Sequence, residues 1–451
     1  MKIIFLGGTE TVTGSKFLIE TTSTRVLVDC GLFQGYKWLR ERNWQSLPLD
    51  IGKLDAVLLT HAHLDHSGYI PVLYKQGFRG RVYTHKASRD LCEILLADSG
   101  HLQEEDAKYF AKHKLSKHAH PQPLYDRATA EACMSLFEPV EFAQSVAVGD
   151  IEFHLQSAGH ILGAASIIVT AEGKRIGFSG DVGRLDDILM HAPKPLPALD
   201  LLLLESTYGN RAHAPQNPFE QLAELVKSTA QRGGVVLIPA FAVGRAQLLQ
   251  HMLASLMADG KIPKMPIYLD SPMAIDVSGV FCRYGEQHKL SAEECARMCQ
   301  VVTYTRTVDE SKALAGQAFP HIIIAGSGMA SGGRILHHFK RLIGNSKTTV
   351  LFTGFQAGGT RGAKMLAGAD AIKIHGEWFP VRAQVTALSG LSGHADYLEI
   401  TDWLKHSELA PQTAIQLIHG EPEALEAQRD HLNRHTAFKA EVAGYRKVLH
   451  L

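Results

Sequence analysis

The segment HAHLDH at residues 61–66 constrains this chain more than any other feature of its sequence. It places His61, His63, Asp65 and His66 within six positions, directly after the apolar run DAVLLT. A short apolar run of this kind favours a β-strand, so the cluster is expected on a loop at the carboxyl end of that strand. A lone histidine is usually a surface or core residue, but a cluster of nitrogen and oxygen donors is typical of zinc sites. The segment therefore predicts metal binding, with His61 and His63 facing one ion and Asp65 and His66 able to face a second.

Further strands end in metal-binding residue types. EFHLQSAGH ends in His160, KRIGFSGD ends in Asp181, and LDLLLLEST carries Glu205. Strand ends that meet at one edge of a sheet are where α/β proteins build their sites. We expect His160 and Asp181 to complete the cluster, with the Asp181 carboxylate bridging two metals.

Length and composition bound the class of protein. A chain of 451 residues is too long for one ordinary domain, so two domains are expected. Lys plus Arg equals Asp plus Glu at 46 each, which argues against a strongly basic binder without excluding a local basic groove. The six cysteines are scattered without a C-x-x-C pair, and no apolar run approaches a membrane span. These features predict a soluble, cytoplasmic protein in a reducing compartment.

The pattern of residues changes after residue 200. Three segments at 233–253, 320–343 and 348–366 each have a strand pattern, a glycine-rich loop and a helix pattern. Histidine-bearing loops return after residue 375. The simplest organisation is one domain split by an insertion, with limits at 1–205, 206–374 and 375–451. The proline-rich stretch at 190–200 is the best candidate for a crossing between structural units.

These motifs together resemble a known family. H-x-H-x-D-H after a strand, Asp29 in VLVDCG, a later AGH and a later SGD resemble the metallo-β-lactamase fold. LLLESTYGN, GLSGHAD and LIHGE resemble the three signature motifs of the β-CASP nucleases, relatives of the cleavage and polyadenylation specificity factor endonuclease subunit. The resemblance covers essentially the whole chain. It implies an α/β architecture, a metallo-β-lactamase αββα sandwich with an inserted α/β β-CASP domain that clamps nucleic acid.

The resemblance also implies residue roles. One zinc would be held by His61, His63 and His160, and a second by Asp65, His66 and His419, with Asp181 between them. Asp29 would orient the HAHLDH loop without binding metal. Glu205 and His394 would form a catalytic pair beside the two zincs, with Asp65 also catalytic.

The implied reaction is hydrolysis of RNA phosphodiester bonds. Metal-bound hydroxide would attack phosphorus in a two-metal mechanism, and His394 would protonate the leaving oxygen as general acid. His419 at the third motif favours RNA, because the DNA-repair branch of the family usually has an apolar residue there. Single-stranded RNA is the expected substrate. Endonucleolytic or exonucleolytic action and a possible homodimer stay open.

The inserted domain is expected to contact phosphate. Glycine-rich loops at helix starts present backbone N–H groups to anions. The candidate phosphate contacts are Arg245, Ser327, Gly328, Ser331, Gly332, Arg334, Thr360 and Arg361. Each can equally belong to an ordinary helix-start loop or be a surface arginine. The basic stretch at 112–120 is either a solvated surface segment or a patch that guides the nucleic acid.

Three other functions are consistent with the same sequence. A DNA nuclease of the same family is the runner-up, followed by a small-molecule hydrolase of the same fold. A catalytically silent scaffold that binds RNA or protein is the third, although such relatives lose ligands that are all present here. The chain starts at its first strand and stops soon after His419, from which we expect neither an amino-terminal RNA-binding module nor an extra carboxyl-terminal domain.

Overall fold

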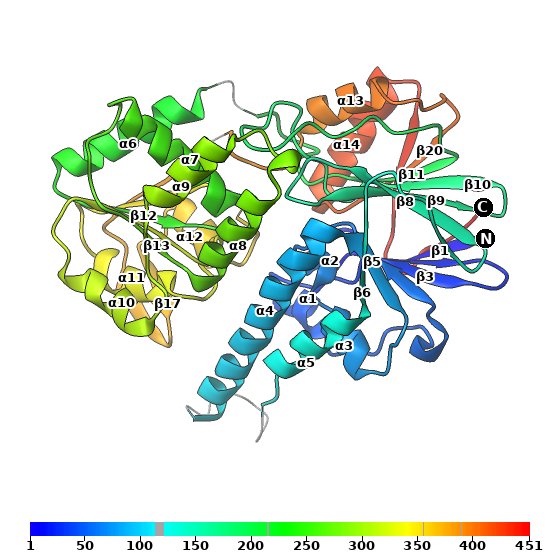
Figure 1. The fold of residues 1–451 in the computed structure, drawn as a ribbon, viewed down its shortest axis with the longest axis horizontal. Helices are drawn as coiled ribbons and strands as arrows, with labels where there is room; N and C mark the ends of the chain where they lie inside the picture. The colour runs from blue at the N-terminus through cyan, green and yellow to red at the C-terminus, as the bar shows by residue number, and fades with distance from the viewer. Residues whose placement is uncertain (113–120, 214–215, 355, 389) are drawn as a thin grey trace. The chain divides into compact units, whose positions relative to one another are not determined.

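A computed structural model describes residues 1–112, 121–213, 216–354, 356–388 and 390–451 (Figure 1). Most of the basic stretch at 112–120 lies outside these described residues. Contacts between Cα atoms divide the chain into two compact units, residues 1–212 with 393–451 and residues 213–392. Each unit is described by itself.

The first unit contains two mixed β-sheets of seven strands each in the described residues. One sheet has the order β22 (Val448–His450), β1 (Lys2–Gly7), β2 (Lys16–Glu20), β3 (Arg25–Val28), β4 (Ala56–Leu58), β5 (Arg81–His85) and β6 (Phe137–Val140). The other has the order β21 (Lys439–Val442), β20 (Ala414–Ile418), β11 (Leu201–Glu205), β10 (Lys174–Phe178), β9 (Ala165–Ala171), β8 (Ile151–Ser157) and β7 (Val146–Val148).

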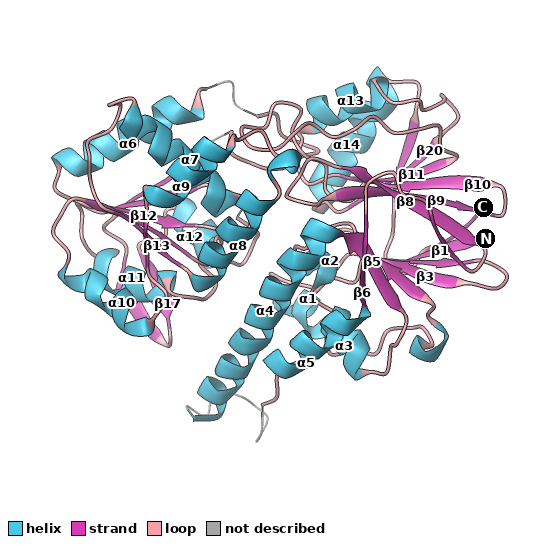
Figure 2. Cartoon of the chain, viewed as in Figure 1, coloured by secondary structure: helices cyan, strands magenta, loops and turns pink. Residues whose placement is uncertain are grey.

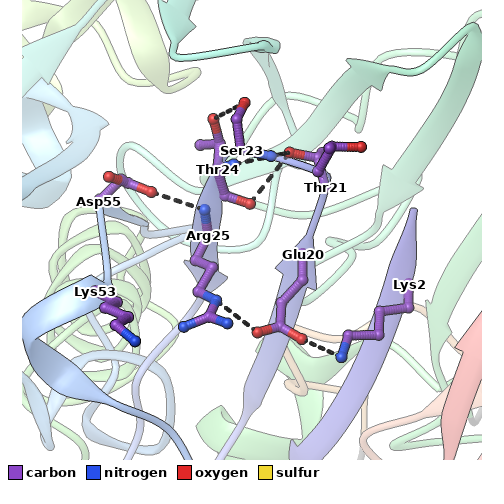
Figure 3. A pocket seen from close by; sticks show the side chains of 9 residues that line it. Lys2, Glu20, Thr21, Ser23, Thr24, Arg25, Lys53 and Asp55 are labelled. Carbon is purple, nitrogen blue, oxygen red and sulfur yellow. Dashed lines mark hydrogen bonds and ion pairs between the residues drawn. The ribbon is translucent and has the colours of Figure 1, made fainter.

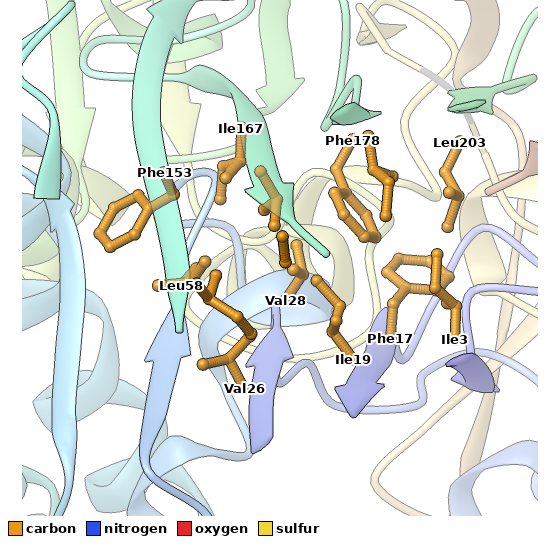
Figure 4. Packing of buried hydrophobic residues seen from close by; sticks show 14 of the residues in the cluster. Ile3, Phe17, Ile19, Val26, Val28, Leu58, Phe153, Ile167, Phe178 and Leu203 are labelled. Atoms are coloured by element: carbon orange, nitrogen blue, oxygen red, sulfur yellow. The ribbon is translucent and has the colours of Figure 1, made fainter. Parts of the chain in front are cut away.

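The core of this unit lies between the two sheets (Figure 4). Side chains of one sheet, such as Phe17 and Leu58, pack in one buried cluster with Phe153 and Phe178 of the other. Alternate residues of each strand face this layer because side chains alternate along a β-strand. The opposite face of the second sheet buries a separate cluster that includes Trp403 of helix α13 (Tyr397–Lys405).

Helices cover the outer faces of both sheets, as Figure 2 shows for this unit. They are α1 (Lys37–Arg42), α2 (Leu64–Ser67), α3 (Ile70–Lys75), α4 (Lys86–Lys112), α5 (Arg127–Cys133), α13 (Tyr397–Lys405) and α14 (Pro422–His435), with 3₁₀ turns η1 (Ile51–Lys53) and η2 (Met134–Leu136). Helix α4 contacts the first sheet and α14 contacts the second. The expected αββα sandwich is therefore confirmed.

The second unit is built on one parallel sheet. Its order is β14 (Thr303–Tyr304), β13 (Ile267–Asp270), β15 (His321–Ala325), β12 (Val235–Pro239), β16 (Thr349–Phe352) and β19 (Gln384–Ala387), beside a hairpin of β17 (Ala371–Ile374) and β18 (Glu377–Pro380). The central strands are buried along their whole length, as expected of a parallel sheet covered on both faces. Strand β19 pairs with β16, so this compact unit extends past residue 374, where the sequence pattern places the return.

The helices of the second unit follow the strands along the chain. They are α6 (Pro218–Gln231), α7 (Arg245–Ala258), α8 (Pro272–Arg283), α9 (Ala292–Gln300), α10 (Val308–Ala313), α11 (Ile335–Leu342) and α12 (Arg361–Leu366), with 3₁₀ turns η3 (Gly285–Gln287) and η4 (Leu314–Gly316). Within the described ranges, no helix of either unit is both long and apolar enough to span a bilayer.

The proline-rich stretch at 190–200 does not cross between units. It connects β10 to β11, which are parallel neighbours in one sheet, and buries Leu196 and Leu199 against that sheet. The prediction of a crossing there was wrong, because its prolines keep a connection extended within the first unit rather than mark a boundary. The assignment of domains to 1–205, 206–374 and 375–451 remains a prediction.

The two ends of the strands in the first unit differ in character. At one end, Glu20 pairs with both Lys2 and Arg25 along an open hollow (Figure 3). Asp55, which lines the same hollow, precedes β4, whereas His61 follows it. The hollow therefore lies at the edge opposite the HAHLDH loop, and its charges are satisfied by each other.

Candidate metal centre

Loops at the carboxyl ends of four strands, together with the short helix α2, bring the predicted ligands together. Two groups of donor atoms each lie within 4.8 Å of one another. The first group is His61, His63, His160 and Asp181, and the second is Asp65, His66 and His419. These groups correspond to the two ligand sets that the family resemblance implies, with the bridging Asp181 grouped here with the first set, and all of these residues are buried or half-buried.

The imidazole rings point their nitrogens at each other across small gaps. His63 Nδ1 lies 3.2 Å from His61 Nε2 and 3.4 Å from His160 Nε2. In the second group, His66 Nε2 lies 3.1 Å from His419 Nε2. Lone pairs that face each other at such distances repel unless a proton or a cation lies between them.

The hydrogen bonds at the outer nitrogens of three rings indicate whether a proton or a cation is expected in these gaps. His66 Nδ1 donates to Asp29 at 2.7 Å, and His160 Nδ1 donates to the carbonyl of Gly393 at 3.0 Å. His61 Nδ1 donates at 3.0 Å to the hydroxyl of Thr60, which in turn donates to Asp29. With the outer nitrogens protonated by this assignment, a neutral ring presents a lone pair inward. The residues therefore fit metal ions.

Asp181 lies between the two groups and faces both. Its Oδ2 is 3.4 Å from His61 and 3.6 Å from His160. Its Oδ1 is 3.2 Å from His66 Nε2, is fully buried and accepts no hydrogen bond. A buried carboxylate oxygen without a partner is costly unless a cation satisfies it. This position suits a carboxylate that binds one ion through each of its two oxygens.

The ionisation of these groups also suits a cation. Burial lowers the pKa of His63 to about 3 and lowers that of His160 as well, so both rings are neutral near pH 7. Burial alone would lower the pKa of His66, but the carboxylates of Asp181 and Asp29 raise it well above its usual value. The negative charge that draws a proton to His66 is charge that a bound metal would neutralise.

Glu205 and His394 form a second pair beside this centre. His394 Nδ1 donates to Glu205 Oε1 at 3.1 Å, and that carboxylate also accepts the backbone N–H of Val182 and of Thr207. Burial alone would lower the pKa of His394, but the charge of Glu205 raises it to about 9. The pair therefore holds a protonated imidazole whose Nε2 is 3.9 Å from Asp181 Oδ2.

Two residues of the site adopt a left-handed backbone. Asp29 has φ 58° and His419 has φ 49°, a region that is sparsely populated by residues other than glycine. The His419 N–H donates to the Gly8 carbonyl at 2.6 Å, which holds that turn in place. Backbone strain kept by surrounding contacts is common at functional sites.

A glycine two residues after Asp29 lets two loops meet. A Cβ atom at Gly31 would lie 1.6 Å from the carbonyl oxygen of Asp65. Backbone hydrogen bonds from Cys30 to His66 and from Leu32 to Leu64 run on either side of this contact. The VLVDCG motif thus supports the HAHLDH loop through its backbone as well as through Asp29.

The predicted phosphate contacts lie in three loops of the second unit. Ser327, Gly328, Ser331 and Gly332 lie between β15 and α11, while Arg245 and Thr360 lie at the starts of α7 and α12. The phosphate role of these positions stays a prediction.

Two of the predicted arginines have partners within the protein. Arg334 donates to Asp270 Oδ1 at 2.7 Å and to backbone carbonyls, and Arg361 donates to the carbonyls of Lys373 and Ser331 at 2.7 and 3.0 Å. Both guanidinium groups therefore hold loops together, whatever else they contact.

Sequence analysis missed two hydroxyl groups at the site. Thr60 bridges Asp29 and His61, and Thr207 lies 3.1 Å from His419 Nδ1. Each stands next to a motif residue, Thr60 directly before His61 and Thr207 two residues after Glu205. The position beside a ligand or an acid was the only available indication.

The sandwich fold and the two histidine–carboxylate groups define a metal-dependent hydrolase of the metallo-β-lactamase fold. Sequence models of three families match consecutive parts of the chain. They are the beta-lactamase superfamily domain at 24–238, the Beta-Casp domain at 246–365 and the Zn-dependent metallo-hydrolase RNA specificity domain at 378–443. This chain belongs to the β-CASP family.

Several relatives support this family assignment, and one solved structure shares the fold. Ribonuclease TTHA0252 of Thermus thermophilus is 36% identical over 435 residues, covering 94% of each chain. Transcription termination factor FttA of Methanocaldococcus jannaschii is 30% identical over 93% of this chain and 67% of its own, and an RNase J-like protein of that organism is 30% identical over 92% of each. A protein of unknown function from Enterococcus faecalis V583 covers 100% of this chain and 99% of its own with TM-score 0.54 and 13% identity, which supports the fold alone.

Proposed function

We propose that this protein is a ribonuclease that uses two zinc ions per chain. The observation that carries the proposal is the single buried Asp181 carboxylate, with one oxygen facing each group of histidines. Nitrogen and oxygen donors of this kind are the usual ligands of catalytic zinc. Relatives named as ribonucleases, and a matching domain described as an RNA specificity domain, support RNA as the substrate.

The chemistry divides between the ions and the protein. Bound zinc would make water nucleophilic near neutral pH and would screen the negative charge of the phosphate. His394 would supply the proton that the leaving oxygen requires, from Nε2, because its Nδ1 is engaged by Glu205. Glu205 fixes the ring and stabilises its charged form, which makes it a positioning residue for His394.

Asp65 has a different role in this proposal. Its carboxylate lies 3.4 Å from His419 Nε2 and is about one-fifth exposed, so it faces the second group from the open side. Burial raises its pKa, but hydrogen bonding and charge from His419 and His66 lower it below its usual value. It is therefore ionised at neutral pH, as a metal ligand must be.

Cleavage of one RNA and of DNA with the same sequence tests the proposal. Each strand is labelled separately at its 5′ and 3′ ends, so the product ladders also distinguish endonucleolytic from exonucleolytic action. We expect the zinc-loaded protein to cut single-stranded RNA, a chelator to abolish cutting and added zinc to restore it. Equal rates on DNA would identify the runner-up DNA nuclease. A fully zinc-loaded protein that binds RNA without cutting it would be the scaffold.

A duplex arm of the same experiment tests the preference for single strands. Proteins that act on RNA bases or loops use unstacked strands, because the major groove of duplex RNA is narrow. We expect the duplex to be cut more slowly than either of its separated strands. Equal rates would contradict a single-stranded substrate.

A further inference from the structure

Large aromatic side chains are exposed in and around helix α1. Tyr36 is 43% exposed, Trp38 53% and Trp44 63%. Tryptophan is highly buried on average, and exposed aromatic groups that cluster together commonly mark a binding surface. We call Tyr36, Trp38, Trp44 and the neighbouring Tyr445 the aromatic platform.

Cationic side chains lie among these rings. The Arg42 guanidinium is 4.8 Å from the ring centre of Trp38 and 4.1 Å from that of Tyr445, and Arg446 is 5.3 Å from Tyr445. Lys37 and Arg40 are exposed on the same helix. Glu41 is the acidic residue of α1 and pairs with Lys37 at 3.6 Å, which leaves the platform with an excess of positive charge.

The platform is held by buried contacts. Asn43 is 6% exposed, and its side chain both donates to the Phe33 carbonyl at 2.8 Å and accepts from the Phe33 N–H at 2.9 Å. Leu39 is 3% exposed and anchors α1 between the outward-facing rings. The exposure of Trp38 and Trp44 is therefore a fixed feature of a packed segment, which lowers the entropy cost of binding to it.

The segment that leads into α1 contacts the HAHLDH loop within the same unit. The chain reaches it through Leu32, whose N–H donates to the carbonyl of Leu64 in the HAHLDH loop at 2.8 Å. Gln34 then donates from its backbone to Thr13 at 3.3 Å. A strand bound on the platform would thus be anchored by the segment that also supports Asp65 and His66.

We propose that the aromatic platform is a binding site for single-stranded RNA, in which bases stack on Trp38 and Trp44 and phosphates contact Arg40 and Arg42. This rests on the proposed function and adds a site outside the metal centre. Stacking on aromatic rings combined with a positively charged surface is how proteins bind single strands without sequence preference.

A second copy of the chain is the alternative occupant of this surface. In a symmetric dimer the same patch faces itself, so the arginines of one platform would lie against those of the other. Like charges brought together in this way oppose association, whereas a polyanion complements them. The charge of the platform therefore favours RNA.

The test compares a Trp38→Ala, Trp44→Ala double variant with a Trp378→Ala control. Trp378 is 68% exposed on β18 of the second unit and lies outside the platform. Binding of a labelled single-stranded RNA is measured by fluorescence anisotropy on the zinc-loaded full chain. Because each ring supplies a stacking surface for one base, we expect the double variant to bind at least roughly tenfold more weakly. The control should stay within about twofold of the unchanged protein.

Two further measurements exclude a merely structural effect. Trp38→Phe with Trp44→Phe should restore most of the affinity, because a phenyl ring still stacks. Hydrolysis of bis(p-nitrophenyl) phosphate, which contains no RNA strand to lie along the platform, should fall at least about fivefold less than RNA cleavage. Equal loss on both substrates would overturn the proposal.

The remaining outcomes are also decisive. Unchanged RNA affinity in the double variant overturns the proposal. If sedimentation then shows that the unchanged protein is a dimer and the double variant a monomer, the surface is assigned to a second copy of the chain. If the unchanged protein binds RNA through the platform but cuts none, the binding site stands and the ribonuclease proposal fails.

Discussion

The Nδ1 atom of His394 lies 3.1 Å from Oε1 of the buried Glu205 carboxylate. Glu205 is 1% exposed, so its charge acts on the ring through a poorly screened environment. Burial and charge oppose each other at His394, and charge prevails, because the pKa rises to about 9. The imidazole is thereby kept protonated at neutral pH, and it is oriented by the same contact.

The first prediction is that His394→Ala slows RNA cleavage by about 10²–10⁴-fold, the usual contribution of general acid catalysis. The loss should be much smaller for bis(p-nitrophenyl) phosphate, whose leaving group departs without a proton. Rates on both substrates, together with zinc content, check this. An equal loss on the two substrates, or loss of zinc, would contradict the role of His394 as a proton donor.

The second prediction concerns metal content. Elemental analysis of protein purified without chelator should give close to two zinc ions per chain, because two groups of donors converge on Asp181. Asp181→Ala should lower the affinity for both ions together, since one carboxylate serves both groups. His154→Ala is the matched control, because His154 lies on β8 and belongs to neither group. A ratio near zero after addition of zinc would exclude the metal centre.

The third prediction separates Asp29 from the ligands. Its carboxylate accepts hydrogen bonds from the Thr60 backbone at 2.8 Å and from His66 Nδ1 at 2.7 Å, and it contacts the ring from the side away from the proposed ion. Asp29→Asn should keep two ions at saturation but weaken zinc affinity by about 10–100-fold, as loss of a partner behind a ligand does. Competition with a coloured chelator measures this. Asp50→Asn, an exposed cap of η1, is the control and should not change affinity.

The grouping of His160 and Asp181 with the HAHLDH cluster could be anticipated because they stand at the ends of short apolar strands, whereas His419 was assigned by the family resemblance. His160 and Asp181 are far apart in the chain, but parallel and antiparallel pairing brings those strand ends to one edge. What the sequence did not show is which side chains satisfy each other. Arg334 at a helix start has the pattern of a phosphate contact, and only the fold reveals that Asp270, at the end of β13, accepts a hydrogen bond from its guanidinium.

The connections between strands were also hard to predict from the sequence. Prolines at 190–200 suggested a boundary, but the strands on either side are neighbours, and strand pairing is not visible in local composition. Thr60 and Thr207 were likewise overlooked, because a hydroxyl gains its role from the residues that the fold places around it. Local pattern predicted the donors, and tertiary contacts supply their orientation.

The last prediction concerns the stability of the second unit and its dependence on pH. Asp270 is fully buried at the end of β13, with Oδ1 accepting from Arg334 and Thr305 at 2.7 Å and Oδ2 accepting from His338 and Ser311 at 2.6 Å. Burial alone would raise the pKa of this carboxyl, but the four hydrogen bonds lower it by more, so that the pKa lies well below its usual value.

Because the folded pKa lies below the unfolded value of about 4, the ionised carboxylate stabilises the fold above that pH, and the contribution is lost as the pH falls toward the folded pKa. Asp270→Asn should therefore lower the free energy of unfolding by about 3 kcal/mol at neutral pH, the effect of breaking a buried charged network. The difference between the two proteins should shrink steadily below about pH 4. Denaturant unfolding across this range measures it, and Asp276→Asn, which removes a half-exposed pair with Arg306, should change stability by less than about 1 kcal/mol at every pH. A difference for Asp270→Asn that does not vary with pH would mean that packing around the side chain, and not its charge, stabilises the unit.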